Sequence, residues 1–204
     1  MTKIIFATTN KGKLREFQEI LPEGKYSFFT MEDIGFTEEI EENGTTFLEN
    51  AAIKAKAVAK FAAGSETFRE AIVLADDSGL EIDYYDKKPG VMSHRWLGER
   101  TYPQAMQDVM DDMKDVPEEK RGARFVCAMA AVLPGGEVLS VQESVEGRVG
   151  YEMKGENGFG YDPFFYVPEY GCTTAEMTPS QKNEISHRGK ALRSMCRKLE
   201  EQVK

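Results

Sequence analysis

The sequence predicts a mixed-sheet α/β fold. Strand-like apolar runs alternate with amphipathic helical patterns over the first half of the chain, which favours strands connected through helices. In the second half, residues 123–150 read as two long strands joined by a Pro-Gly-Gly turn, which predicts a hairpin. A chain of 204 residues with 41% hydrophobic and 30% charged residues is long enough for one compact unit with a sizeable core.

The first half contains four predicted strands and two predicted helices. KIIFA, residues 3–7, is a short buried strand, and the helix after it carries apolar residues at helical spacing (Leu14, Phe17, Ile20 and Leu21). SFFTM is the second strand. The acidic loop EEIEENGTT then leads into an alanine-rich helix from about Phe47 to Ala62. AIVLA is the third strand, and LEIDYY, which alternates with period two, is the next.

The second half adds two helices around the hairpin and a glycine-rich loop. Thr101 and Pro103 mark the start of a helix with a single apolar face (Ala105, Met106, Val109, Met110 and Met113). The loop KGENGFGYDP follows the hairpin. A final helix runs from about His187 to Glu201, with one side made of Ala191, Leu192, Met195, Cys196 and Leu199.

Charge and cysteine content exclude several classes of protein. A net charge of −9 argues against a protein that grips long nucleic acid, because such binding depends on Lys and Arg. Three cysteines without C-x-x-C spacing indicate a reduced, cytoplasmic protein. The only apolar run near the N-terminus spans residues 4–7, so we expect neither a signal peptide nor a membrane partner.

Two adjacent carboxylates, Asp76 and Asp77, follow the apolar run of the third strand in ADDSGL. Burying either one without a partner would cost several kcal/mol, on the order of the penalty for an unpaired buried ion. A cationic partner is therefore expected, unless both residues are solvated in a turn. Neighbouring side chains of an extended backbone point to opposite faces, so the two aspartates need not have the same role.

The segment ATTNKGK suits an anion. Thr8, Thr9 and Asn10 can cap the helix that follows, Gly12 allows close approach of the backbone, and Lys13 adds a charge. The alternative is a plain Asn cap with solvated lysines. The segment lacks the GxxxxGK[ST] pattern, so it is not a Walker A motif.

The acidic loop offers oxygen ligands for a metal. Glutamates from this loop together with Asp76 or Asp77 would suit Mg²⁺, which needs one or two carboxylates along with water and phosphate oxygens. A solvated acidic surface is the alternative. No His or Cys occurs in these segments, so zinc is not expected.

Two later segments suit a nucleobase. In GFGYDP, Phe159 and Tyr161 offer flat faces beside Asp162, although the same aromatic residues could simply pack under the loop. QKNEISHRGKA places Lys182, His187 and Arg188 near the start of the last helix, where a guanidinium can address a carbonyl or phosphate oxygen. His94 and Trp96 receive no catalytic role.

The motifs together resemble the inosine triphosphate pyrophosphatase family, the dITP/XTP pyrophosphatases. The resemblance runs in order through IIFATTNKGKLREF, EENGTTFLENAAIKA, ADDSGLEID, RFVCAMA, GFGYDPFFYVP and KNEISHRGKAL, and so covers nearly the whole chain. It implies a single domain over residues 1–204, built as two lobes with the nucleotide in a cleft between them, and a homodimer. It also implies hydrolysis of a purine nucleoside triphosphate such as ITP, dITP or XTP to the monophosphate and pyrophosphate.

The resemblance also implies roles for individual residues. Glu41 and Asp77 would hold Mg²⁺, Asp77 would be the proton acceptor, and Ser78 would contact substrate. The triphosphate would bind Thr8, Thr9, Asn10, Lys11, Gly12, Lys13, Lys54 and Lys182. The base pocket would contain Phe159, Gly160, Tyr161, Asp162, His187 and Arg188.

Two departures leave details open. His94-Arg95-Trp96 stands where bacterial relatives more often have a small residue, Arg and Tyr, and Glu41 is adjacent to Glu42, so the metal ligand could shift by one position. Two alternative functions also stay open. One is a related pyrophosphatase for other modified or pyrimidine triphosphates, and the other is a poorly catalytic nucleotide sensor.

Overall fold

The computed structural model describes residues 1–21 and 24–202, and its strands form a seven-stranded sheet in the order β2-β1-β3-β4-β5-β6-β7. The strands are β1 (Thr2–Phe6), β2 (Tyr26–Thr30), β3 (Ile72–Ile82), β4 (Gly122–Val132), β5 (Val138–Val149), β6 (Phe165–Val167) and β7 (Cys172–Thr173). The helices are α1 (Lys11–Ile20), α2 (Phe47–Ala62), α3 (Tyr102–Asp112), α4 (Pro179–Ile185) and α5 (His187–Gln202). Strand β1 is parallel to β2 and β3, whereas β6 is antiparallel to β5 and β7. The predicted mixed-sheet α/β class is confirmed.

The chain divides into two compact units. The first unit comprises Met1–Asp77, Cys127–Glu143 and Arg188–Lys204, and the second comprises Ser78–Val126 and Ser144–His187. Strands β3, β4 and β5 each contribute residues to both units. Each unit has its own apolar core and is described separately below.

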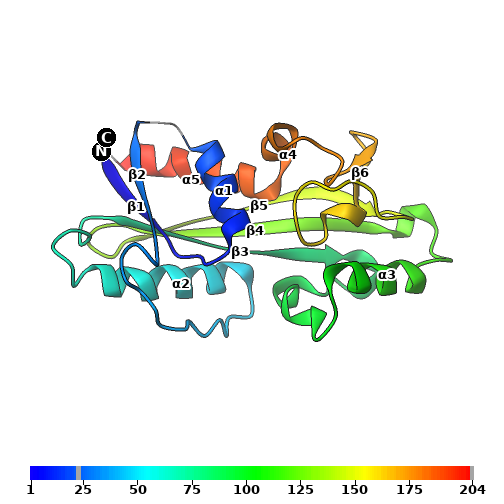
Figure 1. Ribbon diagram of the computed structural model, residues 1–204, viewed down its shortest axis with the longest axis horizontal. Helices are drawn as coiled ribbons and strands as arrows, with labels where there is room; N and C mark the ends of the chain where they lie inside the picture. Colours follow the sequence, from blue (N-terminus) through cyan, green and yellow to red (C-terminus); the bar gives the residue numbers. More distant parts are fainter. Residues whose placement is uncertain (22–23, 203–204) are drawn as a thin grey trace. The chain divides into compact units, whose positions relative to one another are not determined.

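The first unit buries both faces of its strands. Residues of α1 and α5 pack on one face, where the core includes Phe17, Leu74 and Leu192. Helix α2 packs on the opposite face, where Val58 and Val73 belong to a separate core (Figure 1). Because both faces are covered by helices, the strands read as continuous apolar runs in the sequence, as expected for parallel strands.

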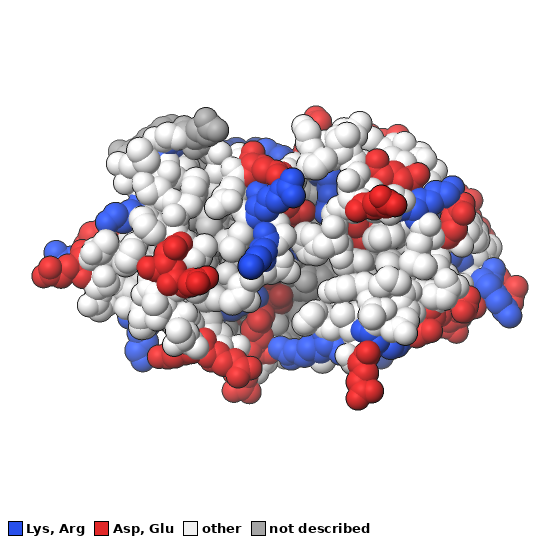
Figure 2. Space-filling model, in the orientation of Figure 1, with Lys and Arg blue, Asp and Glu red and all other residues white. Residues whose placement is uncertain are grey.

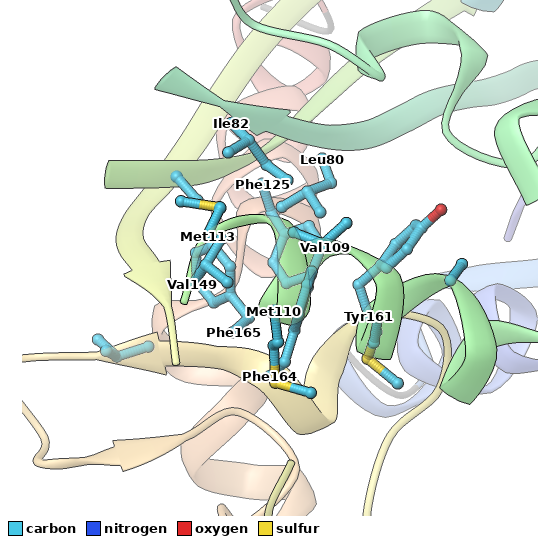
Figure 3. Packing of buried hydrophobic residues seen from close by; sticks show 14 of the residues in the cluster. Leu80, Ile82, Val109, Met110, Met113, Phe125, Val149, Tyr161, Phe164 and Phe165 are labelled. Carbon is cyan, nitrogen blue, oxygen red and sulfur yellow. The ribbon is translucent and has the colours of Figure 1, made fainter. Parts of the chain in front are cut away.

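The second unit is built around an aromatic and methionine core. Met110 of α3 and Met113, the residue that ends α3, pack with Phe125 of β4 and with Phe164 (Figure 3). Tyr161 adds its ring to this cluster, and its hydroxyl points away from the apolar side chains (Figure 3). The methionine stripe predicted as core is therefore confirmed as core.

Local capping explains why the helices begin where the sequence predicts. Thr46 caps α2 by accepting the backbone N–H of Glu49 at 3.1 Å, and the Glu49 side chain in return accepts the N–H of Thr46 at 3.2 Å. The same reciprocal arrangement, a capping box, starts α3 with Thr101 and Gln104. Such a box satisfies two backbone donors that a helix would otherwise leave without a partner.

The prediction of two strands around Asp76 and Asp77 was wrong. A single strand, β3, runs from Ile72 to Ile82 without a break, and the YY of LEIDYY belongs to a short 3-10 helix over Asp83–Tyr85. Strand β3 lies between β1 and β4, so hydrogen bonding on both sides can carry the extended backbone past the charged residues. Helix α4 and the short strands β6 and β7 were not predicted.

None of the helices in residues 1–21 and 24–202 is both long enough and apolar enough to cross a membrane. On the face shown in Figure 2, Lys and Arg side chains are interspersed with Asp and Glu side chains. All three cysteines are free thiols.

Candidate active site

Asp76 and Asp77 lie on opposite faces of β3. Leu74, two residues before Asp76, packs in the core covered by α1 and α5, whereas Ala75, two residues before Asp77, packs in the core covered by α2. Side chains alternate along a strand, so Asp76 points to the same face as Leu74 and Asp77 to the same face as Ala75. Each aspartate has the cationic neighbour that its burial requires, from a different helix in each case.

Asp76 is the buried centre of one ion-pair group. Its side chain has no exposed surface, and its Oδ2 lies 2.8 Å from Nζ of Lys13 in α1 and 3.9 Å from Nε of Arg188 in α5. Burial by itself would raise the pKa of Asp76, but the charges of Lys13, Arg188 and Lys54 outweigh burial and hold the pKa below its usual 3.8. Asp76 is therefore ionised at neutral pH and fixes Lys13.

Arg188 is shared between Asp76 and a residue that the sequence reasoning did not select. Nη1 of Arg188 donates to Oε2 of Glu16 at 3.1 Å, and both side chains are largely buried. Glu16 and Lys13 are three residues apart on α1 and therefore lie on one face of the helix. That spacing is the signal by which Glu16 could have been found.

Asp77 belongs to a second group, formed with α2. The side-chain NH₂ of Asn50 donates to Oδ2 of Asp77 at 3.1 Å, and Nζ of Lys54 lies 3.8 Å from Oδ1. Burial raises the pKa of Asp77 above 3.8 in spite of these neighbours, because desolvation disfavours the charged carboxylate. Asn50 and Lys54 are four residues apart, so one face of α2 presents both to the strand.

Glu42 completes this second group. Nζ of Lys54 donates to Oε2 of Glu42 at 2.7 Å, whereas the predicted metal ligand Glu41 is exposed. Burial would lower the pKa of Lys54, but Asp76, Asp77 and Glu42 together raise it above 10.5. The acidic loop thus brings Glu42, and not the predicted Glu41, into contact with Lys54, which also neighbours Asp77.

A glycine permits the turn from the acidic loop into α2. The backbone N–H of Gly44 donates to Oδ1 of Asn50 at 2.8 Å. A Cβ at residue 44 would lie 2.6 Å from that oxygen and 2.7 Å from Cβ of Glu49, which no side chain could accept without a shift of the backbone. Gly44 therefore holds the Asn50 amide in the orientation that offers its NH₂ to Asp77.

The start of α1 is capped by Asn10, one of the three residues predicted to cap it. Oδ1 of Asn10 accepts the backbone N–H groups of Gly12 at 2.9 Å and Lys13 at 3.2 Å, and the Thr8 hydroxyl accepts the N–H of Asn10 at 3.2 Å. Thr9 and Lys11 are exposed. In this segment, the side chain of Lys13 reaches the carboxylate of Asp76 in β3.

The second unit contains the GFGYDP segment, residues 158–163, which is predicted to bind the base and is called the base loop below. Its residues are arranged around Asp162. This buried carboxylate accepts the backbone N–H of Phe159 at 2.8 Å, the Thr174 hydroxyl at 2.8 Å and Nζ of Lys182 at 2.7 Å. The Lys182 ammonium also lies 5.1 Å from the centre of the Phe159 ring. Lys182, which the resemblance assigns to the triphosphate, is thus placed with the base-loop residues.

Gly158 is required for this loop to close on Asp162. Its φ is +76°, and a Cβ there would lie 2.1 Å from Oδ2 of Asp162. Any other residue would both strain the backbone and displace the carboxylate. The glycine of the motif therefore serves the position of Asp162 and, through it, Lys182.

The other predicted residues of the second unit are partly buried or buried. His187 stacks on Phe125 with ring centres 5.0 Å apart, and the Tyr161 hydroxyl donates to the carbonyl oxygen of Ser93 at 2.9 Å. Ser78 follows Asp77 on β3 and is half-buried. Each unit thus gathers its own share of the predicted residues: Lys13, Lys54, Asp77 and Arg188 in the first, and Phe159, Asp162, Lys182 and His187 in the second.

The sequence was compared with models of known protein families. Residues 4–198, nearly the full length of the chain, match the model of the Ham1 family. The chain belongs to the Ham1 family. The relationship inferred from the sequence motifs is thereby confirmed.

Individual Ham1 relatives match over almost their whole length. A dITP/XTP pyrophosphatase of Bacillus subtilis is 47% identical over 201 residues, which cover 98% of each chain. The solved structure of a HAM1 protein from Coxiella burnetii has 38% identity and a TM-score of 0.85, over 98% of this chain and 100% of that one. A nucleoside-triphosphatase / dITP/XTP pyrophosphatase structure from Mycobacterium abscessus has 37% identity and a TM-score of 0.74, over 95% and 98% of the two chains.

Proposed function

We propose that this Ham1 protein hydrolyses deaminated purine nucleoside triphosphates, ITP, dITP and XTP, to the monophosphate and pyrophosphate. The observation that carries the proposal is the Asp77 group. A carboxylate with a raised pKa lies beside an amide donor and a partly buried lysine, and a second carboxylate shares that lysine. The names of the relatives, dITP/XTP pyrophosphatase, support the substrate class.

The charges of the first unit support a requirement for a divalent cation. Three cations (Lys13, Lys54 and Arg188) stand with four carboxylates (Glu16, Glu42, Asp76 and Asp77), which leaves a formal net charge of −1. A triphosphate is itself strongly anionic, so this group does not attract it by net charge. Added positive charge is needed, and a bound Mg²⁺, which accepts phosphate oxygens as ligands, would supply it.

Asp77 and Glu42 fit such an ion. Among the residues that the structure describes, no three His, Cys, Asp or Glu side chains are grouped so as to hold a metal. Mg²⁺ in nucleotide sites needs only one or two carboxylates, with water and phosphate supplying the rest. We assign Glu42, in preference to Glu41, as the second carboxylate, because Glu42 shares Lys54 with Asp77. When bound, Mg²⁺ lowers the pKa of a water molecule and screens phosphate charge.

Asp77 accepts the proton of the attacking water. The water oxygen forms a bond to the α-phosphorus, the bond between that phosphorus and the α–β bridging oxygen breaks, and its electron pair leaves with pyrophosphate. The raised pKa makes Asp77 a stronger base than a solvated aspartate, since basicity increases with pKa. Asn50 holds the carboxylate in place through its 3.1 Å hydrogen bond.

Lys13 and Lys54 bind phosphate oxygens, and the Phe159 loop binds the base. Both lysines are already held by carboxylates, so little side-chain freedom is lost when phosphate takes over as their partner. Stacking on Phe159 contributes about 1–3 kcal/mol and tolerates any base. Selection of 6-oxo purines then falls to Arg188, whose guanidinium only donates and therefore suits a carbonyl. From the three free cysteines and the resemblance described above, we further propose that the protein acts in the cytoplasm as a homodimer.

The test is hydrolysis of ITP in ¹⁸O-labelled water with Mg²⁺. The expected products are IMP and pyrophosphate, with the label in IMP, because water attacks the α-phosphorus. Release of IDP and orthophosphate, or label found in pyrophosphate, would contradict the mechanism. EDTA should abolish turnover, and a panel with XTP, ATP and pyrimidine triphosphates tests the base class.

A further inference from the structure

His94 and Tyr102 form a pair in the second unit that the proposed function leaves without a role. Nδ1 of His94 lies 3.4 Å from the hydroxyl oxygen of Tyr102. Tyr102 is the first residue of α3, and the capping box of Thr101 and Gln104 fixes the backbone there. The pair therefore has a defined position, even though His94 itself is exposed.

The Tyr102 ring lies against the GFGYDP loop. Its centre is 5.0 Å from that of Tyr161, and the two rings are nearly perpendicular at 87°. A Cβ built at Gly160 would lie 3.6 Å from the Tyr102 ring, and φ of Gly160 is +69°. The Tyr102 ring therefore lies close to the loop at Gly160, the residue that follows Phe159.

A second connection holds His94 to the same loop. The Tyr161 hydroxyl donates to the carbonyl oxygen of Ser93, the residue before His94, at 2.9 Å. The Ser93 hydroxyl in turn accepts the backbone N–H of Leu80 in β3 at 2.8 Å. Both members of the pair are thus anchored, through Tyr161, to the loop assigned to the base.

We propose, on the basis of the function proposed above, that Tyr102 is a further substrate-positioning residue and contacts the purine base beside Phe159. The Tyr102 ring lies edge-to-face with that of Tyr161, and the residue is only partly buried, so part of its surface can contact a ligand. His94 orients the ring through its hydroxyl. Because an aromatic ring packs against any base, Tyr102 contributes affinity and not selection between purines.

The test measures kcat and KM for ITP in Tyr102→Ala, Tyr102→Phe, His94→Ala and the Tyr102→Phe/His94→Ala double variant. Tyr102→Ala should raise KM about tenfold and leave kcat within about twofold, the pattern expected when a binding contact of the ground and transition states is lost. Tyr102→Phe and His94→Ala should each raise KM about twofold to threefold, and the double variant should be no worse than either, because both changes remove one contact. Tyr84→Ala, at an exposed tyrosine of the same unit, is the matched control and should behave as wild type.

The outcomes separate this inference from the proposed function. If wild type releases pyrophosphate from ITP but Tyr102→Ala keeps its KM within twofold, or loses kcat alone, the role of Tyr102 is refuted while the function stands. If wild type releases none, both fail. Should Tyr102→Ala not fold, the double-variant cycle decides, and additive or absent effects on KM overturn the inference.

Discussion

The same substitution, Asp to Asn, should lower stability at position 76 but not at position 77. The Asp76 side chain has no exposed surface, and its carboxylate pairs with Lys13 at 2.8 Å. Asp76→Asn removes the negative charge of this ion pair. Breaking a buried ion pair costs about 3–5 kcal/mol, and the lower end applies because Lys13 keeps some contact with solvent. For a chain of this length each kcal/mol corresponds to about 2–4 °C, so a loss of about 3 kcal/mol lowers Tm by about 6–12 °C.

Asp77→Asn should leave Tm unchanged or raise it by up to about 4 °C, the equivalent of about 1 kcal/mol. Burial raises the pKa of Asp77, so the folded protein disfavours the charge that the substitution removes. Lys54 keeps Glu42 as a partner at 2.7 Å. Activity should respond in the reverse order: Asp77→Asn should lose about 10²–10⁴-fold or more in kcat, as removal of a general base does, and Asp76→Asn should lose less.

Thermal unfolding as a function of pH provides the assay. The folded-state pKa of Asp76 is lowered, so its stabilisation is present above 3.8 and is lost as pH falls through the folded pKa. The Tm gap between wild type and Asp76→Asn should therefore be full at pH 7 and close below about pH 3.8. The Tm difference between wild type and Asp77→Asn should also close in acid, because the Asp77 side chain of the wild type is then protonated and neutral. An equal loss of Tm in both variants at pH 7 would refute the reasoning, and the exposed Asp115→Asn is the control.

Three further outcomes follow from the site. Glu42→Gln should raise the Mg²⁺ concentration for half-maximal activity about tenfold or more, whereas Glu41→Gln should stay near wild type; the reverse result would restore Glu41 as the ligand. Gly158→Ala should lower stability by at least about 1–2 kcal/mol in denaturant unfolding and raise KM for ITP, since φ is +76° and the Cβ would meet Asp162; wild-type values would contradict the loop geometry. Arg188→Ala should reduce the preference for ITP over ATP in kcat/KM by about tenfold or more; an unchanged preference would mean that another donor reads the base.

Much of the fold was predictable because its signals are local. Helix α2 begins and ends at the predicted residues, Phe47 and Ala62, since a capping box and an unbroken apolar stripe both lie within the segment. The break predicted after residue 75 failed for the opposite reason. The charges of Asp76 and Asp77 are tolerated in a continuous strand because their partners come from α1 and α2, which no local pattern reveals. Strands of two or three residues, such as β7 and β6, are too short to show a period.

The sequence predicted which kinds of residue form the candidate site better than it predicted which of them contact one another. The need for a cation beside the two aspartates followed from the cost of burying charge, and the structure provides one for each. Glu16 and Asn50 were missed although each lies at helical spacing from a selected lysine, Lys13 and Lys54 respectively. The roles assigned to the individual site residues stay predictions until the variants are measured.

In the first unit, Lys13, Lys54 and Arg188 are each paired with a carboxylate, which has a consequence for the proposed binding of substrate. Phosphate must compete with Asp76 for Lys13 and with Glu42 for Lys54, so binding exchanges one ion pair for another and gains little from the lysines alone. On the proposed function, a divalent ion held by Glu42 and Asp77 would change this balance, because those carboxylates would then compete less with phosphate for Lys54. Metal and nucleotide would then each strengthen the binding of the other, since coupling between two ligands is reciprocal. On this proposal, the carboxylates that compete with phosphate for the lysines would make nucleotide binding depend on the metal.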